Sequence, residues 1–184
     1  MTTGTGIVRW QSTVDPTRCG LELAGYFADQ HRLEAELDKG LGKSSVTRPA
    51  FVFTSPGSTR AEDIASAVTR AADFSSDARM CVALDAEALC ATDSVVLRKA
   101  NVGILLDHVD ADTPLSIITT DLIEAVRFDE TFLRRAYVDS RSACVLAAML
   151  GLAHDLGLAT LGSVDEANAN GEFAFDYVVI PAFD

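Results

Sequence analysis

Short runs of apolar and β-branched residues alternate along the chain with longer stretches in which apolar residues recur every three or four positions. This alternation is typical of a parallel sheet or barrel with helices outside it, so the pattern predicts an α/β protein. The predicted strands are Gly6–Trp10, Ala50–Thr54, Met80–Leu84, Val102–Asp107, Ala125–Asp129, Ala159–Gly162 and Phe175–Ile180.

The stretches with helical periodicity are Leu21–Leu37, Arg60–Phe74 and Ser140–Leu156. The second follows a capping box made by Thr59 and Glu62. The third is the best defined, because Asp139 is suited to cap its N-terminus and Gly157 to end it. Its broad apolar stripe consists of Val145, Leu146, Met149, Leu152 and Leu156.

The length and composition of the chain restrict the classes of function that it can have. The 184 residues suit one domain, 1–184, without an internal repeat or linker. A formal net charge of -12, with no basic stripe, argues against a nucleic-acid partner. No secretory signal and no run of ~20 apolar residues is visible, so we expect a cytoplasmic protein without a membrane association. The cysteines lie far apart and are expected to be reduced core residues, not a metal site: Cys19, Cys81, Cys90 and Cys144.

Later segments carry a more specific signal. These are VGILLDHV at 102–109, EAVRFDETFL at 124–133, LAHDLGLATLGSVDE at 152–166 and FDYVVIP at 175–181. In order and spacing they resemble the "GxxxALDDFG", "DxxKID", "lGlxvxAEGVE" and "DxxQGxxxxxP" segments of the EAL-type cyclic-di-GMP phosphodiesterases. Nearer the N-terminus, TGIVRW at 5–10, FVFTSP at 51–56 and VALDAEAL at 82–89 resemble the "EALLRW", "vNlSp" and "lElTEsaL" strands of the same family.

The resemblance spans nearly the whole chain and implies a TIM-barrel-like, modified barrel of the EAL type. Family members carry one more strand before the EAL strand, so the resemblance also implies an incomplete barrel with the first family strand missing. Such a barrel has an open strand edge that another segment or a partner must cover.

Phosphodiester hydrolysis with two divalent cations requires several carboxylates at the strand ends, because these cations bind hard oxygen ligands. At the positions that the resemblance assigns to the family's polar site, this chain carries Thr5, Phe53, Ala83, His108, Gly162 and Val179. The family residues there are Glu, Asn, Glu, Asp, Glu and Gln. The resemblance therefore implies a degenerate site with no catalytic residue, no bound metal and no cofactor.

A remnant of the site is retained as Arg9, Asp107, Arg127 and Asp129. In the family, the position of Arg9 contacts a phosphate. Arg127 replaces a lysine; it keeps the charge, but it stays protonated at any working pH and presents a fork where an ammonium would orient water. The alternative interpretation of this group is a salt-bridged strand end without a ligand.

The first function hypothesis is a catalytically inactive regulatory module that binds a protein partner, such as a transcription or signalling factor, and forms a homodimer. The second is a receptor that binds cyclic-di-GMP or a related nucleotide through Arg9, Asp107 and Arg127 without cleaving it. The third is an enzyme of unrelated chemistry at the same mouth, for which Asp107, His108 and Asp129 are the titratable candidates.

Overall fold

The computed structural model describes residues 6–15, 18–24, 48–54, 64–66, 69, 79–162 and 173–179. Their strands are β1 (Gly6–Ser12), β2 (Arg18–Ala24), β3 (Arg48–Thr54), β4 (Arg79–Leu84), β5 (Gly103–Val109), β6 (Ile123–Phe128), β7 (Ala159–Gly162) and β8 (Tyr177–Val179). Their helices are α3 (Ala86–Ala91), α4 (Ser94–Ala100), α5 (Leu115–Ile118), α6 (Glu130–Ala136) and α7 (Ser140–Asp155).

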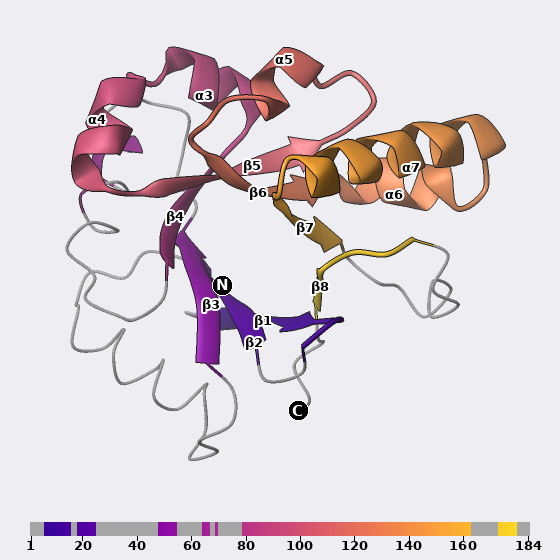
Figure 1. Ribbon diagram of the computed structural model, residues 1–184, viewed down its shortest axis with the longest axis horizontal. Helices are drawn as coiled ribbons and strands as arrows, with labels where there is room; N and C mark the ends of the chain where they lie inside the picture. Colours follow the sequence, from indigo (N-terminus) through magenta and orange to yellow (C-terminus); the bar gives the residue numbers. More distant parts are fainter. Residues whose placement is uncertain are drawn as a thin grey trace, which may run out of the picture.

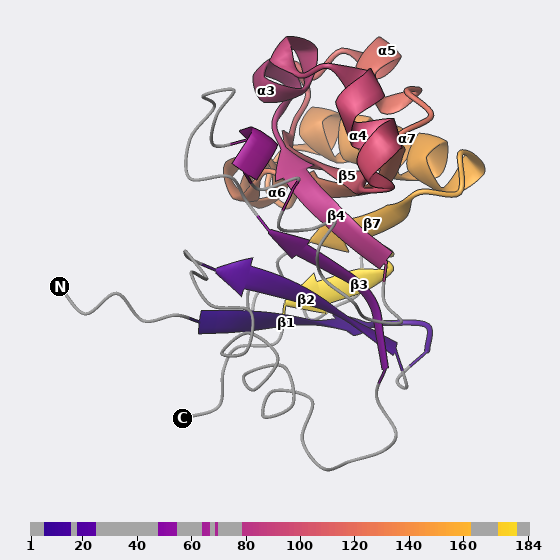
Figure 2. The ribbon, with the colours of Figure 1, turned by 90° about the vertical axis from the view of Figure 1, so that its left-hand side faces the viewer.

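The strands follow one another in sequence order around a ring. Each strand from β2 to β7 runs parallel to the next one, and β1 runs antiparallel to both β2 and β8. Pairing of Trp10 with Val179 closes the ring between the first strand and the last. Figures 1 and 2 show the labelled helices gathered around the part of the ring formed by β4 to β7. This architecture confirms the predicted α/β, TIM-barrel-like fold.

The strand count corrects one detail of the prediction. Residues Leu21–Ala24 belong to β2 and not to a helix, because β2 pairs with β1 on one side and with β3 on the other. The ring thus closes through eight strands within the described residues, and the open edge expected from a missing family strand is taken up by β8 against β1. The remainder of the predicted helix Leu21–Leu37 lies outside the described residues.

Helix starts are fixed by aspartates. The carboxylates of Asp85, Asp93, Asp129 and Asp139 each accept a hydrogen bond from a backbone N–H in the first turn of α3, α4, α6 and α7. For α7 this confirms both the predicted helix and its cap, and Gly157 follows with a positive φ of 72°. Of the predicted helix Arg60–Phe74, residues 64–66 and 69 are described and are helical.

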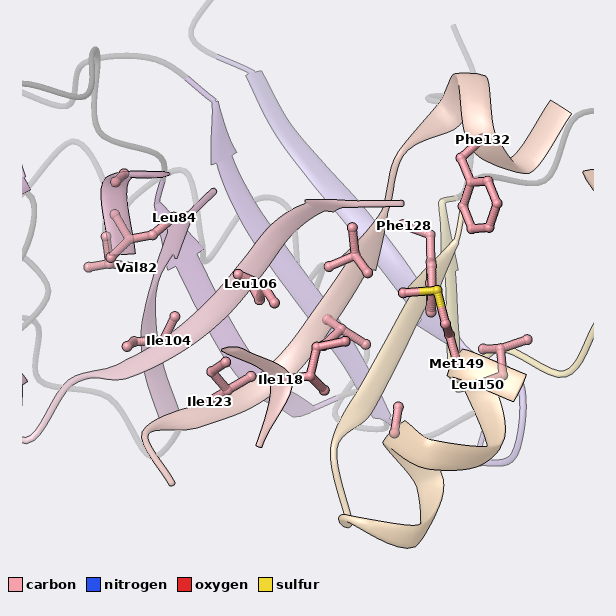
Figure 3. Packing of buried hydrophobic residues seen from close by; sticks show 14 of the residues in the cluster. Val82, Leu84, Ile104, Leu106, Ile118, Ile123, Phe128, Phe132, Met149 and Leu150 are labelled. Carbon is pink, nitrogen blue, oxygen red and sulfur yellow. The ribbon is translucent and has the colours of Figure 1, made fainter. Parts of the chain in front are cut away.

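The core has two parts. A large cluster lies between the outer face of the strands and the helices, and Figure 3 shows members of it from β4, β5, β6 and α7 packing together. A smaller cluster fills the barrel interior with Trp10, Cys81, Ala83, Leu105, Ala125, Leu161 and Tyr177. Cys81 is buried as expected, whereas Cys90 and Cys144 are exposed, which corrects their assignment to the core; all three are free thiols.

None of the described helices alone is long and apolar enough to cross a bilayer. The bent pair formed by α6 and α7, with 120° between the two helices, meets the requirement by length and composition only.

Candidate functional site at the barrel mouth

An ion pair between neighbouring strands lies at the mouth of the barrel. Asp107, near the end of β5, and Arg127, near the end of β6, each lie two positions after an interior residue, Leu105 and Ala125, and so belong to the same face of their strands. The Nε of Arg127 donates to Oδ1 of Asp107 at 2.7 Å, and Nη2 donates to Oδ2. The Asp107 side chain is 9% exposed and that of Arg127 18%. A two-pronged, largely buried pair of this kind is strong and directional.

The guanidinium of Arg127 also faces an aromatic ring. Its Cζ lies 5.9 Å from the ring centroid of Trp10, which comes from the antiparallel strand β1 and is only 3% exposed. An arginine over an indole face at this distance is a favourable cation–π contact. The Arg127 head is thus held by a carboxylate and by a ring, and it serves as a link across the barrel interior.

A β-bulge shapes the same strand end. Leu106 pairs with Val126, and Val109 pairs with Phe128. Between these two pairs β5 therefore has one more residue than β6. His108 takes up the extra length with a positive φ of 54°. Histidine is among the residues that enter this left-handed region more readily, and the backbone N–H of His108 donates to Oδ1 of Asp107 at 2.8 Å. The bulge turns the imidazole outward, where its side chain is 68% exposed.

Asp129 completes the group. Its carboxylate caps α6 by accepting from the Phe132 N–H at 3.0 Å, and its other oxygen lies 3.5 Å from Nδ1 of His108. The second nitrogen of His108, Nε2, lies 3.9 Å from Oδ2 of Asp107. The three titratable side chains that the sequence analysis singled out therefore do lie close together. Both carboxylates are engaged in structural contacts, however, since Asp107 pairs with Arg127 and Asp129 caps α6.

The arrangement is poorly suited to a metal ion. A divalent cation needs several free oxygen ligands, and the guanidinium of Arg127 engages both oxygens of Asp107 and would repel a cation there. Within the described part of the chain, no group of three or more His, Cys, Asp or Glu side chains is placed to hold a metal ion. The described residues at these strand ends do not fit the two-metal centre that the family resemblance implies.

No protein-family model matches the sequence, and no curated protein matches it either. Solved structures do. The EAL domain of Mycobacterium smegmatis DcpA has a TM-score of 0.55 at 12% identity, with 97% of this chain and 90% of that chain covered. The EAL domain of Pseudomonas aeruginosa FimX, bound to c-di-GMP, has a TM-score of 0.59 at 12% identity and coverages of 94% and 86%. The fold is that of an EAL domain.

A third match is the S helix-GGDEF-EAL portion of Vibrio cholerae LapD, bound to c-di-GMP, with a TM-score of 0.59 and 14% identity. It covers 95% of this chain but 51% of that chain. At these identities the likeness establishes the EAL-type fold and leaves the chemistry to be argued from the residues themselves.

In the EAL-type barrel the remaining predicted site positions lie in different places. Ala83 faces the interior, in the cluster that contains Leu105 and Trp10. Gly162 lies against the ring of Phe175, and a Cβ atom there would come within 2.8 Å of that ring. Because Leu161 belongs to the interior cluster, Gly162 belongs to the opposite face of β7. A side chain at Gly162 would thus meet the outer core and not the barrel mouth.

Other predicted positions are placed by their backbone only. Arg9 pairs with Leu21, Phe53 pairs with Cys81, and Val179 pairs with Trp10. Their side chains, and the whole of Thr5, lie outside the described residues.

The sequence analysis missed a second polar cluster, on the outer face of the barrel between α7, β7 and the segment before β8. Oδ2 of Asp176 accepts hydrogen bonds from the backbone N–H and the hydroxyl of Thr160, at 2.9 and 2.8 Å, and lies 3.5 Å from Nε2 of His154. Thr160 is fully buried. Its hydroxyl is therefore a structural tie and not an accessible nucleophile. A polar Thr within the apolar strand Ala159–Gly162 was the available signal.

Proposed function

We propose that this chain is a non-catalytic EAL-type domain that regulates a cyclic-di-GMP signalling pathway by binding a protein partner. The observation that carries the proposal is the ion pair of Asp107 with Arg127. A carboxylate at the position where the family's site keeps an aspartate has both of its oxygens committed to a permanent cation, which in turn packs against Trp10. The Asp107 carboxylate at the barrel mouth is thereby engaged in a stabilising contact.

The lost ligands support the same conclusion. Two-metal hydrolysis depends on several converging carboxylates, and removal of one such group commonly costs orders of magnitude in rate. Ala83 offers no ligand atom from β4, and His108 cannot bridge two metals as a carboxylate does. A barrel that keeps the EAL-type fold without phosphodiester hydrolysis can still serve as a scaffold that binds a protein partner.

A cyclic-di-GMP receptor is the second candidate, favoured by the fact that the FimX and LapD structures contain the bound ligand. An anionic ligand would have to compete with Asp107 for the fork of Arg127 and overcome a net charge of -12. The interaction role therefore ranks first. In the receptor hypothesis, substitution of Arg9 or Arg127 by alanine abolishes binding.

The deciding experiment is calorimetric titration of the purified protein with cyclic-di-GMP, with and without Mg²⁺ or Mn²⁺, run beside a hydrolysis assay of the same sample. The PaMucR phosphodiesterase serves as a positive control for turnover and the FimX EAL domain for binding. We expect neither heat of binding nor product. Binding without turnover would establish the receptor role, and metal-dependent turnover would overturn the proposal.

A further inference from the structure

The turn between α6 and α7 carries an exposed apolar residue between two arginines. Val138, in this turn, is 86% exposed. Arg135 precedes it by three residues and Arg141 follows it by three, and both are exposed. The chain bends by 120° between the two helices, and Figure 1 shows them at the right of the molecule, outside the strand ring. Arg135, Val138 and Arg141 are called the α6–α7 patch below.

The two arginines of the patch stand apart from other arginines of the helices. Arg98 pairs with Asp121, and Arg134 pairs with Glu130. Within the described residues, neither Arg135 nor Arg141 takes part in an ion pair. Arg141 also lies in the first turn of α7, where the helix dipole favours negative side chains. The stability of α7 therefore does not explain a positive charge at this position.

The backbone of the turn is held by several contacts. The N–H groups of Val138 and Asp139 donate to the carbonyl of Arg135 at 3.1 and 2.9 Å. Asp139 in turn caps α7, and the ring of Tyr137 packs edge-on against that of Phe173, with centroids 5.3 Å apart. Val138 is thus exposed on a turn whose conformation is already fixed. A fixed surface loses little conformational freedom when a partner binds to it.

The charge of the patch is opposite to that of the whole chain, whose formal net charge is -12. Exposed charges more than about 8 Å apart are largely screened at physiological salt, so a bound group is affected mainly by its neighbours. The neighbouring carboxylates are engaged: Glu130 pairs with Arg134, and Asp139 accepts hydrogen bonds in the first turn of α7. A local positive charge therefore remains at Arg135 and Arg141, on a molecule whose overall charge repels acidic groups.

We propose that the α6–α7 patch is the docking site for an acidic segment of the partner protein. Carboxylates of that segment bind Arg135 and Arg141, and an apolar side chain packs on Val138. The inference rests on the interaction role proposed above and names the chemistry of the partner. Arginine suits this task because its planar fork binds a carboxylate through two hydrogen bonds. An apolar contact between the two pairs excludes water from them.

A protein segment fits the patch better than an anionic membrane does. Binding in the plane of a membrane requires a broad apolar face beside the basic residues, whereas Val138 is followed directly by the polar residues Asp139 and Ser140. The negative surface of a bilayer with anionic lipids would also repel a chain of net charge -12. A narrow segment contacts the patch without approaching the rest of the acidic surface.

The test uses a short fluorescein-labelled peptide in which glutamates alternate with leucines, and fluorescence anisotropy measures its affinity for the full chain. We expect a weak complex whose affinity falls as the salt concentration rises from about 0.05 to 0.3 M. The variant R135E/R141E should lose affinity for this peptide by about tenfold or more, and V138S by about fivefold. R135E/R141E should also gain affinity for a peptide in which lysines replace the glutamates, a gain that unfolding could not produce.

The matched controls are K99E and V95S on α4. They change the same kinds of exposed residue at a helix that Figure 1 shows on the other side of the molecule, so they should leave the affinity unchanged. Equal losses in the patch and control variants, or no binding of the glutamate peptide at any concentration, would overturn the inference. Binding of the wild type to vesicles of phosphatidylcholine and phosphatidylserine, but not to the peptide, would overturn it as well. These outcomes leave the hydrolysis assay and the titration with cyclic-di-GMP, which test the proposed function, unaffected.

Discussion

At the scale of single residues, the barrel mouth is organised by one largely buried ion pair. Arg127 donates to both oxygens of Asp107 and also packs against the ring of Trp10, and little of either charged side chain is exposed to solvent. Removing one member of a buried pair is costly because the other charge is left without its partner. The pair is therefore a structural element of this barrel, and it is also the observation on which the proposed non-catalytic role rests.

This predicts that D107A lowers the free energy of unfolding by about 2–4 kcal/mol, measured by urea denaturation. The double variant D107L/R127M, which removes both charges and keeps apolar volume, should lose less than D107A alone. D121A is the control, because Asp121 pairs with Arg98 on the surface, with side chains 72% and 53% exposed, and should change stability little. An equal loss in D107A and D121A would contradict the assigned role.

At the scale of elements, the sequence predicted a helix correctly where the apolar periodicity, the N-cap and the terminating glycine were all present. The α7 helix, its Asp139 cap and its Gly157 stop follow from neighbouring residues, and so the sequence was sufficient. The short helices α3, α4 and α6 went unpredicted, although an aspartate cap precedes each of them. In β2, the alternation of Cys19, Leu21 and Leu23 competed with a looser helical spacing, and pairing with β1 and β3 decided the outcome.

The cap of α7 gives a pH-dependent prediction. Hydrogen bonds from the Ser142 hydroxyl, and then from its backbone N–H, lower the pKa of the Asp139 carboxyl. A lowered pKa in the folded state stabilises the protein above the unfolded value of about 3.9, and this stabilisation is lost as the pH falls through the folded value. D139A should lower the melting temperature by roughly 2–6 °C at pH 7, with the deficit shrinking below about pH 4.

D139N is the control for this experiment. Asparagine is about as good a helix cap as aspartate and does not titrate, so D139N should retain most of the melting temperature at pH 7. The cap in D139N does not titrate, whereas the cap in the wild type does. The difference in melting temperature between the two proteins should therefore vary with pH. If D139A and D139N lose equally at pH 7, the contribution of Asp139 is not that of a capping acceptor.

At the scale of the whole molecule, the site depends on contacts that no local pattern contains. The sequence brought Asp107, His108, Arg127 and Asp129 together through their strand ends, and the structure confirms that they are neighbours. It missed the ring of Trp10, which is distant in the sequence and comes from the antiparallel strand. It also missed the bulge at His108, because a bulge depends on the register of β5 against β6. The contact of Gly162 with the ring of Phe175, on the outer face of β7, was also missed, because the two residues are far apart in the sequence.

Closure of the barrel ring gives the last prediction. β8 contributes three residues, and the segment before it is held by Thr13, Thr160 and the packing of Phe175 on Phe128, with ring centroids 5.9 Å apart. In G162A, the new Cβ would lie 2.8 Å from the Phe175 ring, which is itself 3% exposed and cannot move without disturbing the core. We expect G162A to lose about 1–3 kcal/mol of stability.

The matched control for that prediction is G151A, because a Cβ at this exposed helical position meets nothing within 4 Å. Alanine should stabilise α7 there by about 0.5–1 kcal/mol, so the same chemical change has opposite signs at the two glycines. Both variants are to be measured by urea denaturation at low protein concentration, so that self-association does not contribute. If G162A were as stable as the wild type, Phe175 would not be fixed against β7, and closure of the ring through β8 would need another explanation.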